Sequence, residues 1–137
     1  MGRPGYVYLL RLEQDRDPFR CVYKVGRTTD LRSRHKMLGV LMPYPVTLVW
    51  AMNSDDAAHT ERFVHEQFAG ARMDGEWFRL TREQVEQFIA VGMMGEYGED
   101  IIRDPMTHDM IGRIASGEIN YDFIKSIEGL YRSAARQ

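Results

Sequence analysis

Two apolar stretches near the start of the chain, residues 5–12 and 21–26, are rich in β-branched and aromatic residues, as strands are. The residues between them, 13–20, are mostly polar and include a proline, which is typical of a loop. Such a short loop joins antiparallel neighbours, because a parallel connection needs a crossover of roughly a dozen residues or more. The chain therefore begins with a predicted antiparallel hairpin, and its fold must contain an antiparallel sheet.

Helix and strand signals alternate after this hairpin. Side chains at 28–30 can cap a helix that Gly39 would end, and residues 53–56 predict the start of a second helix. A capping box at 81–84 predicts the start of a third helix, and residues 72–75 before it predict a turn. The expected fold is α+β, with a small three-stranded antiparallel sheet of residues 6–12, 21–27 and 46–52, flanked by helices at residues 30–38, 56–68 and 81–91.

Glycines at 92, 95 and 98 interrupt the pattern, so we predict a domain of residues 1–92 followed by a helical extension of residues 93–137. Two helices are expected in the extension, one beginning at Asp104-Pro105 and one capped by Asn120. The last helix has an apolar stripe that must be covered. We expect it to pack on the preceding helix; a homodimer or a contact with a protein partner is the alternative.

Composition places the chain among ordinary globular proteins. With 137 residues, of which 44% are hydrophobic, it can form the core of one domain and is not intrinsically disordered. No apolar run approaches the ~20 residues of a membrane-spanning helix. The single cysteine excludes an internal disulfide framework. We therefore expect a cytoplasmic protein that does not contact a membrane.

Charge is distributed unevenly along the chain. Residues 1–53 carry nine Lys and Arg against four Asp and Glu, whereas residues 54–137 carry nine against sixteen. Fifteen of the eighteen basic residues are arginines, whose planar guanidinium group suits phosphate. The basic half can therefore hold a local anion site, although two ordinary solvated faces would have the same composition.

Familiar catalytic loops are missing from the sequence, which has no phosphate-binding P-loop, no dinucleotide-binding glycine motif and no nucleophile elbow. Four residues on adjacent predicted elements remain as candidates. Tyr8 is on the first strand, Lys24 on the second, Arg34 in the first helix and Glu61 in the second. These residues can meet above a small sheet, and we expect the Tyr8 phenol and the Glu61 carboxylate to open onto one cleft.

The chemistry of these side chains suits phosphodiester hydrolysis. A carboxylate is a hard ligand for Mg²⁺, a guanidinium stabilises phosphate, and a phenol or an amine can move a proton. The ordinary alternative is that Tyr8 belongs to the core while Arg34 and Glu61 are solvated helix residues.

The order and spacing of these residues resemble the GIY-YIG endonuclease superfamily, in particular a branch carried by phages and bacteria. The resemblance covers about residues 5–90. The motifs that carry it are Tyr6-Val7-Tyr8, Tyr23-Lys24-Val25-Gly26-Arg27-Thr28, Arg34, Glu61 and Gly75-Glu76-Trp77-Phe78.

The resemblance implies a metal-dependent endonuclease that acts on DNA. By this resemblance, Tyr8 is expected to activate the attacking water, Arg34 to contact the scissile phosphate, and Glu61 to hold a single Mg²⁺ or Mn²⁺. Lys24 stands where the superfamily motif begins with tyrosine, and Gly26 matches the motif's glycine. The residues expected to bind the substrate are Arg27, Arg32, Lys36 and His65.

Two positions depart from the pattern of the superfamily. No asparagine follows the predicted metal-binding helix until Asn120, so its role is vacant or is filled by Asp74 or Glu76. Leu38 stands where many members have a histidine, and His35 lies next to Arg34 instead. A weakly active or inactive domain that binds nucleic acid is therefore one alternative, and an interaction protein of a phage or mobile element is another.

Overall fold

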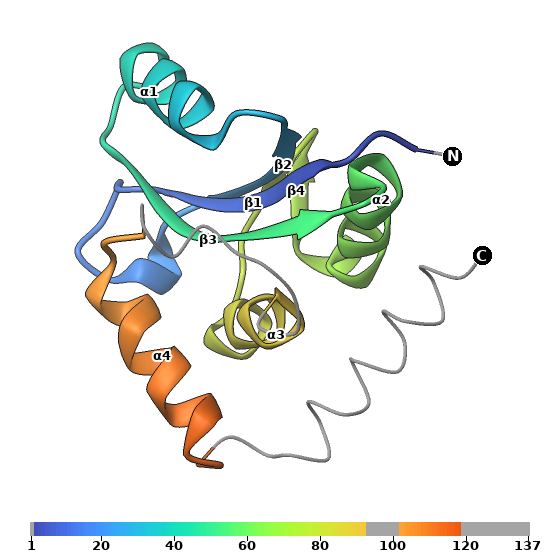
Figure 1. The fold of residues 1–137 in the computed structure, drawn as a ribbon. Helices are drawn as coiled ribbons and strands as arrows, with labels where there is room; N and C mark the ends of the chain where they lie inside the picture. The colour runs from blue at the N-terminus through green and yellow to red at the C-terminus, as the bar shows by residue number, and fades with distance from the viewer. Residues whose placement is uncertain (1, 93–101, 119–137) are drawn as a thin grey trace.

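The computed structural model describes residues 2–92 and 102–118 (Figure 1). Its strands are β1 (Gly5–Leu12), β2 (Tyr23–Thr28), β3 (Val46–Ser54), β4 (Arg72–Asp74) and β5 (Trp77–Phe78). Its α-helices are α1 (Leu31–Leu41), α2 (Ala57–Gln67), α3 (Arg82–Gly92) and α4 (Pro105–Ala115). Short 3-10 turns occur at residues 18–20 and 69–71.

The three predicted strands and the three predicted helices before residue 93 are all present, with small differences at their ends. The largest difference is in α1, which continues through Gly39 to Leu41. A glycine inside a helix costs only about 1 kcal/mol, so it weakens the helix without ending it. Pro43 then prevents the helix from continuing.

The expectation of a three-stranded sheet was wrong in its strand count. The sheet has five antiparallel strands in the order β3-β1-β2-β5-β4. The predicted turn at 72–75 belongs to a hairpin, in which Gly75 adopts a φ of 54° between β4 and β5. Strands of three and two residues are too short to show alternation in the sequence. They form because β5 pairs with the edge of β2 and β4 pairs with β5.

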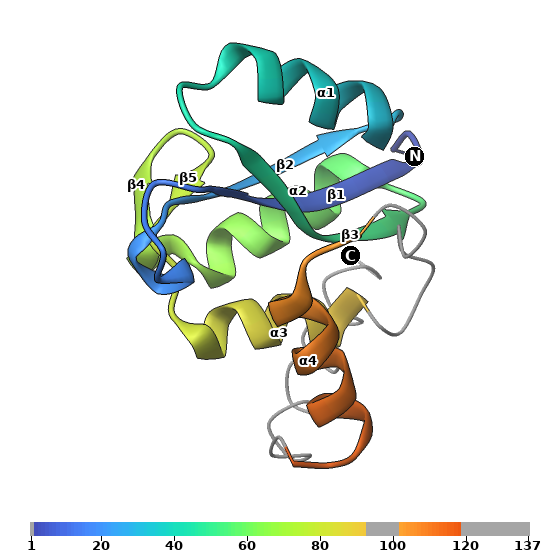
Figure 2. The ribbon, with the colours of Figure 1, turned by 90° about the vertical axis from the view of Figure 1, so that its left-hand side faces the viewer.

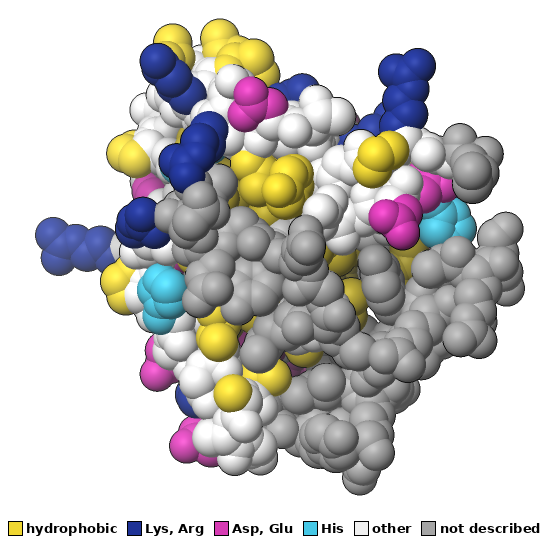
Figure 3. All heavy atoms as spheres, in the orientation of Figure 1, with side chains coloured by type: hydrophobic (Ala, Val, Ile, Leu, Met, Phe, Trp, Pro, Cys, Tyr) yellow, Lys and Arg dark blue, Asp and Glu magenta, His cyan; other side chains and the backbone are white. Residues whose placement is uncertain are grey.

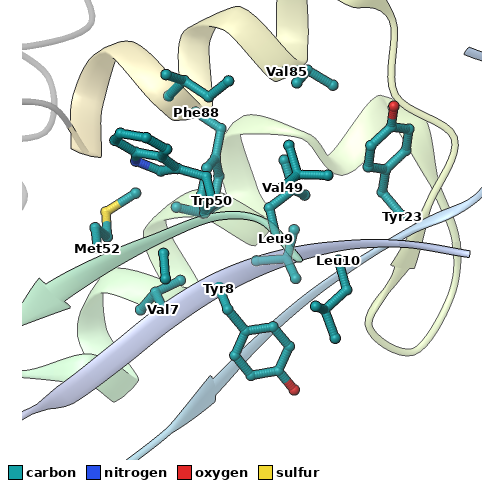
Figure 4. Packing of buried hydrophobic residues seen from close by; sticks show 14 of the residues in the cluster. Val7, Tyr8, Leu9, Leu10, Tyr23, Val49, Trp50, Met52, Val85 and Phe88 are labelled. Carbon is teal, nitrogen blue, oxygen red and sulfur yellow. The ribbon is translucent and has the colours of Figure 1, made fainter. Parts of the chain in front are cut away.

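Helices cover both faces of this sheet. Figure 2 shows α1 on one side and α2 and α3 on the other. Side chains of β1 alternate accordingly, and Figure 4 shows Leu9 directed toward α3 while Tyr8 and Leu10 point to the opposite side. All three side chains are buried. The face of β1 that carries Tyr8 is therefore the face beneath α1.

The predicted helix at Asp104-Pro105 is present as α4 and is joined to β1 by a buried ion pair. The Arg11 guanidinium donates two hydrogen bonds of 3.0 Å to the Asp104 carboxylate, and a third of 2.7 Å to Glu13. Thr107 donates to the same carboxylate at 2.9 Å. Burial alone would raise the pKa of Asp104, but the hydrogen bonds and charge of Arg11 hold it below its ordinary value.

The predicted last helix, capped by Asn120, lies outside the described residues, and the division at residue 92 stays a prediction. None of the helices within residues 2–92 and 102–118 is long and apolar enough to cross a membrane.

Candidate active site

Tyr8 and Gly26 form the centre of the candidate site. They face each other across the antiparallel pair of β1 and β2. A β-carbon built on Gly26 would lie 2.3 Å from the Tyr8 hydroxyl, closer than any real contact. Only glycine therefore allows the phenol to lie across β2 at this point.

Tyr8 is only 1% exposed, and its buried hydroxyl has no hydrogen-bond partner among the described residues. Burial raises the pKa of Tyr8; the positive charge of Arg34 opposes this, whereas Glu76 and Glu61 add to it. Arg34 is thus close enough to act on the phenol, but the two groups do not complete a hydrogen bond of good geometry. An unpartnered buried hydroxyl costs about 1–3 kcal/mol, so this arrangement needs an explanation.

The start of α1 positions Arg34. Asp30 caps the helix by accepting hydrogen bonds from the Ser33 backbone N–H at 3.1 Å and from the Ser33 hydroxyl at 2.9 Å. These bonds hold the pKa of Asp30 below its ordinary value. Arg34 follows in the first turn and is half-buried. The cap predicted from the sequence therefore brings the guanidinium to the Tyr8 side of the sheet.

The outer edge of β2 is shared between β5 and α2. β5 pairs only with Tyr23 and Lys24. Beyond them, Val25 donates its backbone N–H to the Glu76 carbonyl at 3.0 Å, and its carbonyl lies 2.9 Å from Nε2 of His65. The His65 ring also packs on Phe78, with their centroids 5.1 Å apart. His65 therefore attaches α2 to the edge of β2.

Glu61 lies one helical turn before His65, on the same face of α2. One carboxylate oxygen, Oε1, is 3.8 Å from the Arg27 guanidinium. The other, Oε2, is buried and has no hydrogen-bond partner within residues 2–92 and 102–118. Burial and the nearby charge of Glu76 raise the pKa of Glu61, and the opposing effects of His65, Arg27 and Lys24 are smaller.

Lys24 and Glu76 form an ion pair of 2.9 Å beside this carboxylate. The Lys24 ammonium also lies 5.3 Å from the centre of the Trp77 ring. Of the two acids considered for the vacant asparagine role, Glu76 is therefore the one whose charge reaches both Tyr8 and Glu61. Asp74 is exposed on β4.

Comparison with protein-family models identifies the relationship that these motifs indicate. The model of the T5orf172 domain matches residues 5–91, which is more than half of the chain. The chain belongs to the T5orf172 domain family. This domain, found in a phage open reading frame, is related to the GIY-YIG fold, so the resemblance is confirmed. No curated protein and no solved structure matched the chain.

The T5orf172 domain brings the four predicted catalytic residues together. Tyr8, Lys24, Arg34 and Glu61 come from four different elements: Tyr8 lies against Gly26, the charges of Arg34 and Glu61 act on its hydroxyl, and the charge of Lys24 acts on Glu61. The Tyr8 hydroxyl and Oε2 of Glu61 do not open onto a cleft as expected, because both atoms are buried. The catalytic roles of these residues remain predictions.

The predicted substrate-binding residues separate into two groups. Arg27 is exposed beside Glu61, and His65 adjoins them through its bond to β2. Arg32 and Lys36 lie elsewhere, since successive helix residues are rotated by about 100° and both are two positions from Arg34. They therefore point roughly away from the Tyr8 face. Arg103 was not predicted from the sequence, and it lines a hollow together with Arg32 and Lys36.

The described part of this T5orf172 domain offers few side chains that could bind a metal ion. Within the described ranges, no group of three or more His, Cys, Asp and Glu side chains is arranged to hold a metal ion. The available donors are Glu61, with its unpartnered buried oxygen, and the neighbouring Glu76. Mg²⁺ is commonly held by one or two carboxylates together with the phosphates of a substrate. The residues present therefore fit a divalent cation whose coordination the substrate completes.

Proposed function

We propose that this protein is a metal-dependent endonuclease that hydrolyses phosphodiester bonds in DNA. The observation that carries the proposal is the proximity of the Arg34 guanidinium and the Glu61 carboxylate to the Tyr8 phenol, with the phenol oxygen and one Glu61 oxygen buried and without a hydrogen-bond partner among the described residues. Membership of the GIY-YIG-related T5orf172 family supports the same reaction class. Polar groups that are buried for a purely structural reason nearly always have a hydrogen-bond partner, so the unpartnered oxygens favour a functional role.

Glu61 would hold Mg²⁺ or Mn²⁺, with Glu76 beside it. The cation would supply positive charge to the phosphate and its leaving oxygen. Arg34 would stabilise the charge that develops on the phosphoryl oxygens, because a guanidinium presents two parallel donors to them. Arg27 is placed to contact the backbone next to the reacting phosphate.

Tyr8 would first lose its phenol proton to solvent and, as the phenolate, would then receive the proton of the attacking water. Since the pKa of Tyr8 is raised, the phenol is protonated at neutral pH. If the negative charge of Glu61 were neutralised, one of the effects that raise the pKa of Tyr8 would disappear, while the positive charge of Arg34 would still lower this pKa. Lys24, whose ammonium is paired with Glu76, would favour the phenolate by its positive charge or would contact the phosphate.

A domain that binds nucleic acid without cutting it is the second candidate. The burial of the Tyr8 hydroxyl and of Oε2 of Glu61 favours this alternative, because a substrate would have to gain access to both atoms. Divalent-metal binding separates the two candidates.

The test is incubation of the full chain with supercoiled plasmid in Mg²⁺, Mn²⁺ or EDTA. We expect nicking or cutting with metal and none in EDTA. Glu61→Gln should lose cleavage and metal binding, because it removes the charge that a hard cation needs. Glu66→Gln, on the exposed part of the same helix, is the matched control and should cut normally. DNA binding without cleavage in any metal would favour the second candidate.

A further inference from the structure

A second set of basic side chains surrounds an open hollow of about 500 Å³ on the other side of α1. The hollow is lined by Arg32, His35, Lys36 and Gly39 of α1 and by Arg103. Figure 3 shows Lys and Arg side chains on the part of the molecule that carries α1. No acidic residue lines the hollow among the residues that the structure describes.

The spacing of the α1 residues explains the shape of this hollow. Positions 32, 35, 36 and 39 are separated by three, four and seven residues, so they form one stripe along the helix. Gly39 has only open space where a side chain would be, which leaves room between its neighbours. Arg34 is not part of this stripe, so the hollow is separate from the candidate active site.

Arg103 reaches α1 because the segment before α4 is held in place. Its neighbours Ile102 and Asp104 are both buried, and Asp104 accepts two hydrogen bonds from Arg11 of β1. The backbone on either side of Arg103 is therefore anchored, while the Arg103 side chain is exposed. This juxtaposition joins residues about seventy positions apart in the chain.

The charges of the hollow suit a polyanion. Lys36 and Arg103 make no ion pair with any carboxylate in the described ranges, and both are exposed. Lysine and arginine side chains at such spacing bind the phosphates of nucleic-acid backbones, which are the commonest targets of protein–DNA hydrogen bonds. A single small anion would be bound by basic side chains gathered at one point. Here the basic side chains are spread along a helix, which suits a ligand with several phosphates in a row.

We infer that this hollow binds the phosphate backbone of the DNA substrate outside the active site, with Lys36 and Arg103 as its contacts. The inference rests on the proposed function and extends it, since it gives the segment after residue 101 a part in substrate binding. The site contributes affinity and salt dependence without touching the reacting phosphate.

The test measures binding of a fluorescent DNA duplex to the full chain by anisotropy over a range of salt concentrations. Lys36→Gln and Arg103→Gln should each weaken binding several-fold and each reduce the slope of log K against log salt by about 1. Lys36→Arg should keep most of the affinity. Arg16→Gln removes an exposed charge from the loop between β1 and β2 and is the control. Melting curves of each variant establish that folding is unchanged.

The outcomes distinguish this inference from the proposed function. If the natural sequence binds and cuts DNA while Lys36→Gln and Arg103→Gln bind with an unchanged slope, only the inference is overturned. Equal losses in Arg16→Gln would also overturn it, because net charge rather than the hollow would then explain binding. If the natural sequence neither binds nor cuts DNA, both proposals fail.

Discussion

Two groups of polar side chains are buried on neighbouring parts of β1, and they differ in whether their polar atoms have hydrogen-bond partners. Arg11 is paired with Asp104 and Glu13, and Thr107 completes the carboxylate, so each charged group has partners. Only three residues earlier, the Tyr8 hydroxyl has no hydrogen-bond partner in the part of the chain that the structure describes. The same strand therefore carries a satisfied network on one side and an unsatisfied group on the other.

The difference separates structural burial from functional burial. Removing one partner from the Arg11 network would leave a buried charge uncompensated, so the network holds α4 on the sheet. Around Tyr8 the unpartnered atoms, the phenol and one oxygen of Glu61, have an unfavourable free energy in the absence of a ligand. Such a cost is expected where a substrate or a cation supplies the missing partner.

The largest expected effect is on the satisfied network. Arg11→Ala should lower the free energy of unfolding by about 3–5 kcal/mol, because Asp104 remains buried without its partner. Denaturant unfolding measures this loss, and Arg16→Ala in the exposed loop is the control. A loss no larger than in the control would show that the network is dispensable and would break the comparison.

Removal of Arg34 should act on catalysis rather than on folding. Arg34→Ala should reduce kcat by on the order of 10²–10³, the usual effect of losing one preorganised donor. Arg34→Lys should fail nearly as badly, since an ammonium lacks the planar pair of donors. Cleavage rates and DNA affinity are measured side by side, with exposed Arg62→Ala as the control. Equal losses of cleavage rate and DNA affinity would contradict a catalytic role and would show that Arg34 only binds phosphate.

The unpartnered carboxylate should make stability depend on pH. Because the pKa of Glu61 is raised in the folded protein, its ionisation destabilises the fold as pH rises above the ordinary value of 4.5. Below that value the carboxyl is protonated in both states and this effect disappears. In EDTA at pH 7, Glu61→Gln should therefore be more stable by about 0.5–2 kcal/mol, the range common for single stabilising substitutions.

Unfolding free energies from pH 4 to 8 measure this effect, with Glu66→Gln as the exposed control on the same helix. A stability difference that does not change with pH would show that Glu61 carries no strained charge, and the site would then resemble the Arg11 network.

The smallest expected effect concerns the two buried tyrosines of β1 and β2. Tyr8→Phe should change stability by less than about 1 kcal/mol, or should stabilise the fold, because the lost hydroxyl has no partner. Tyr23→Phe is the matched control, since the Tyr23 hydroxyl donates to the Pro18 carbonyl at 3.0 Å, and it should cost about 0.5–1.5 kcal/mol. Cleavage should be lost only in Tyr8→Phe. The opposite order of stabilities would contradict the distinction.

Local patterns were sufficient for much of this protein. The β-branched and aromatic residues of β1 and β2 and the cap at Asp30 determined the hairpin and the start of α1. The order of the motifs also indicated which residues would meet above the sheet, since the face on which a strand residue lies follows from its position. These features depend on residues that are close in the chain.

Only the tertiary structure decided the rest, because it depends on pairings between distant residues. The strands β4 and β5 exist through the edge of β2, and this pairing brings Glu76 to Lys24. The ion pair between Arg11 and Asp104 places Arg103 beside α1. Burial of the Tyr8 hydroxyl likewise requires α1 to cover the sheet. Neither periodicity nor a capping motif encodes these contacts, since their energy comes from partners that the folded chain brings together.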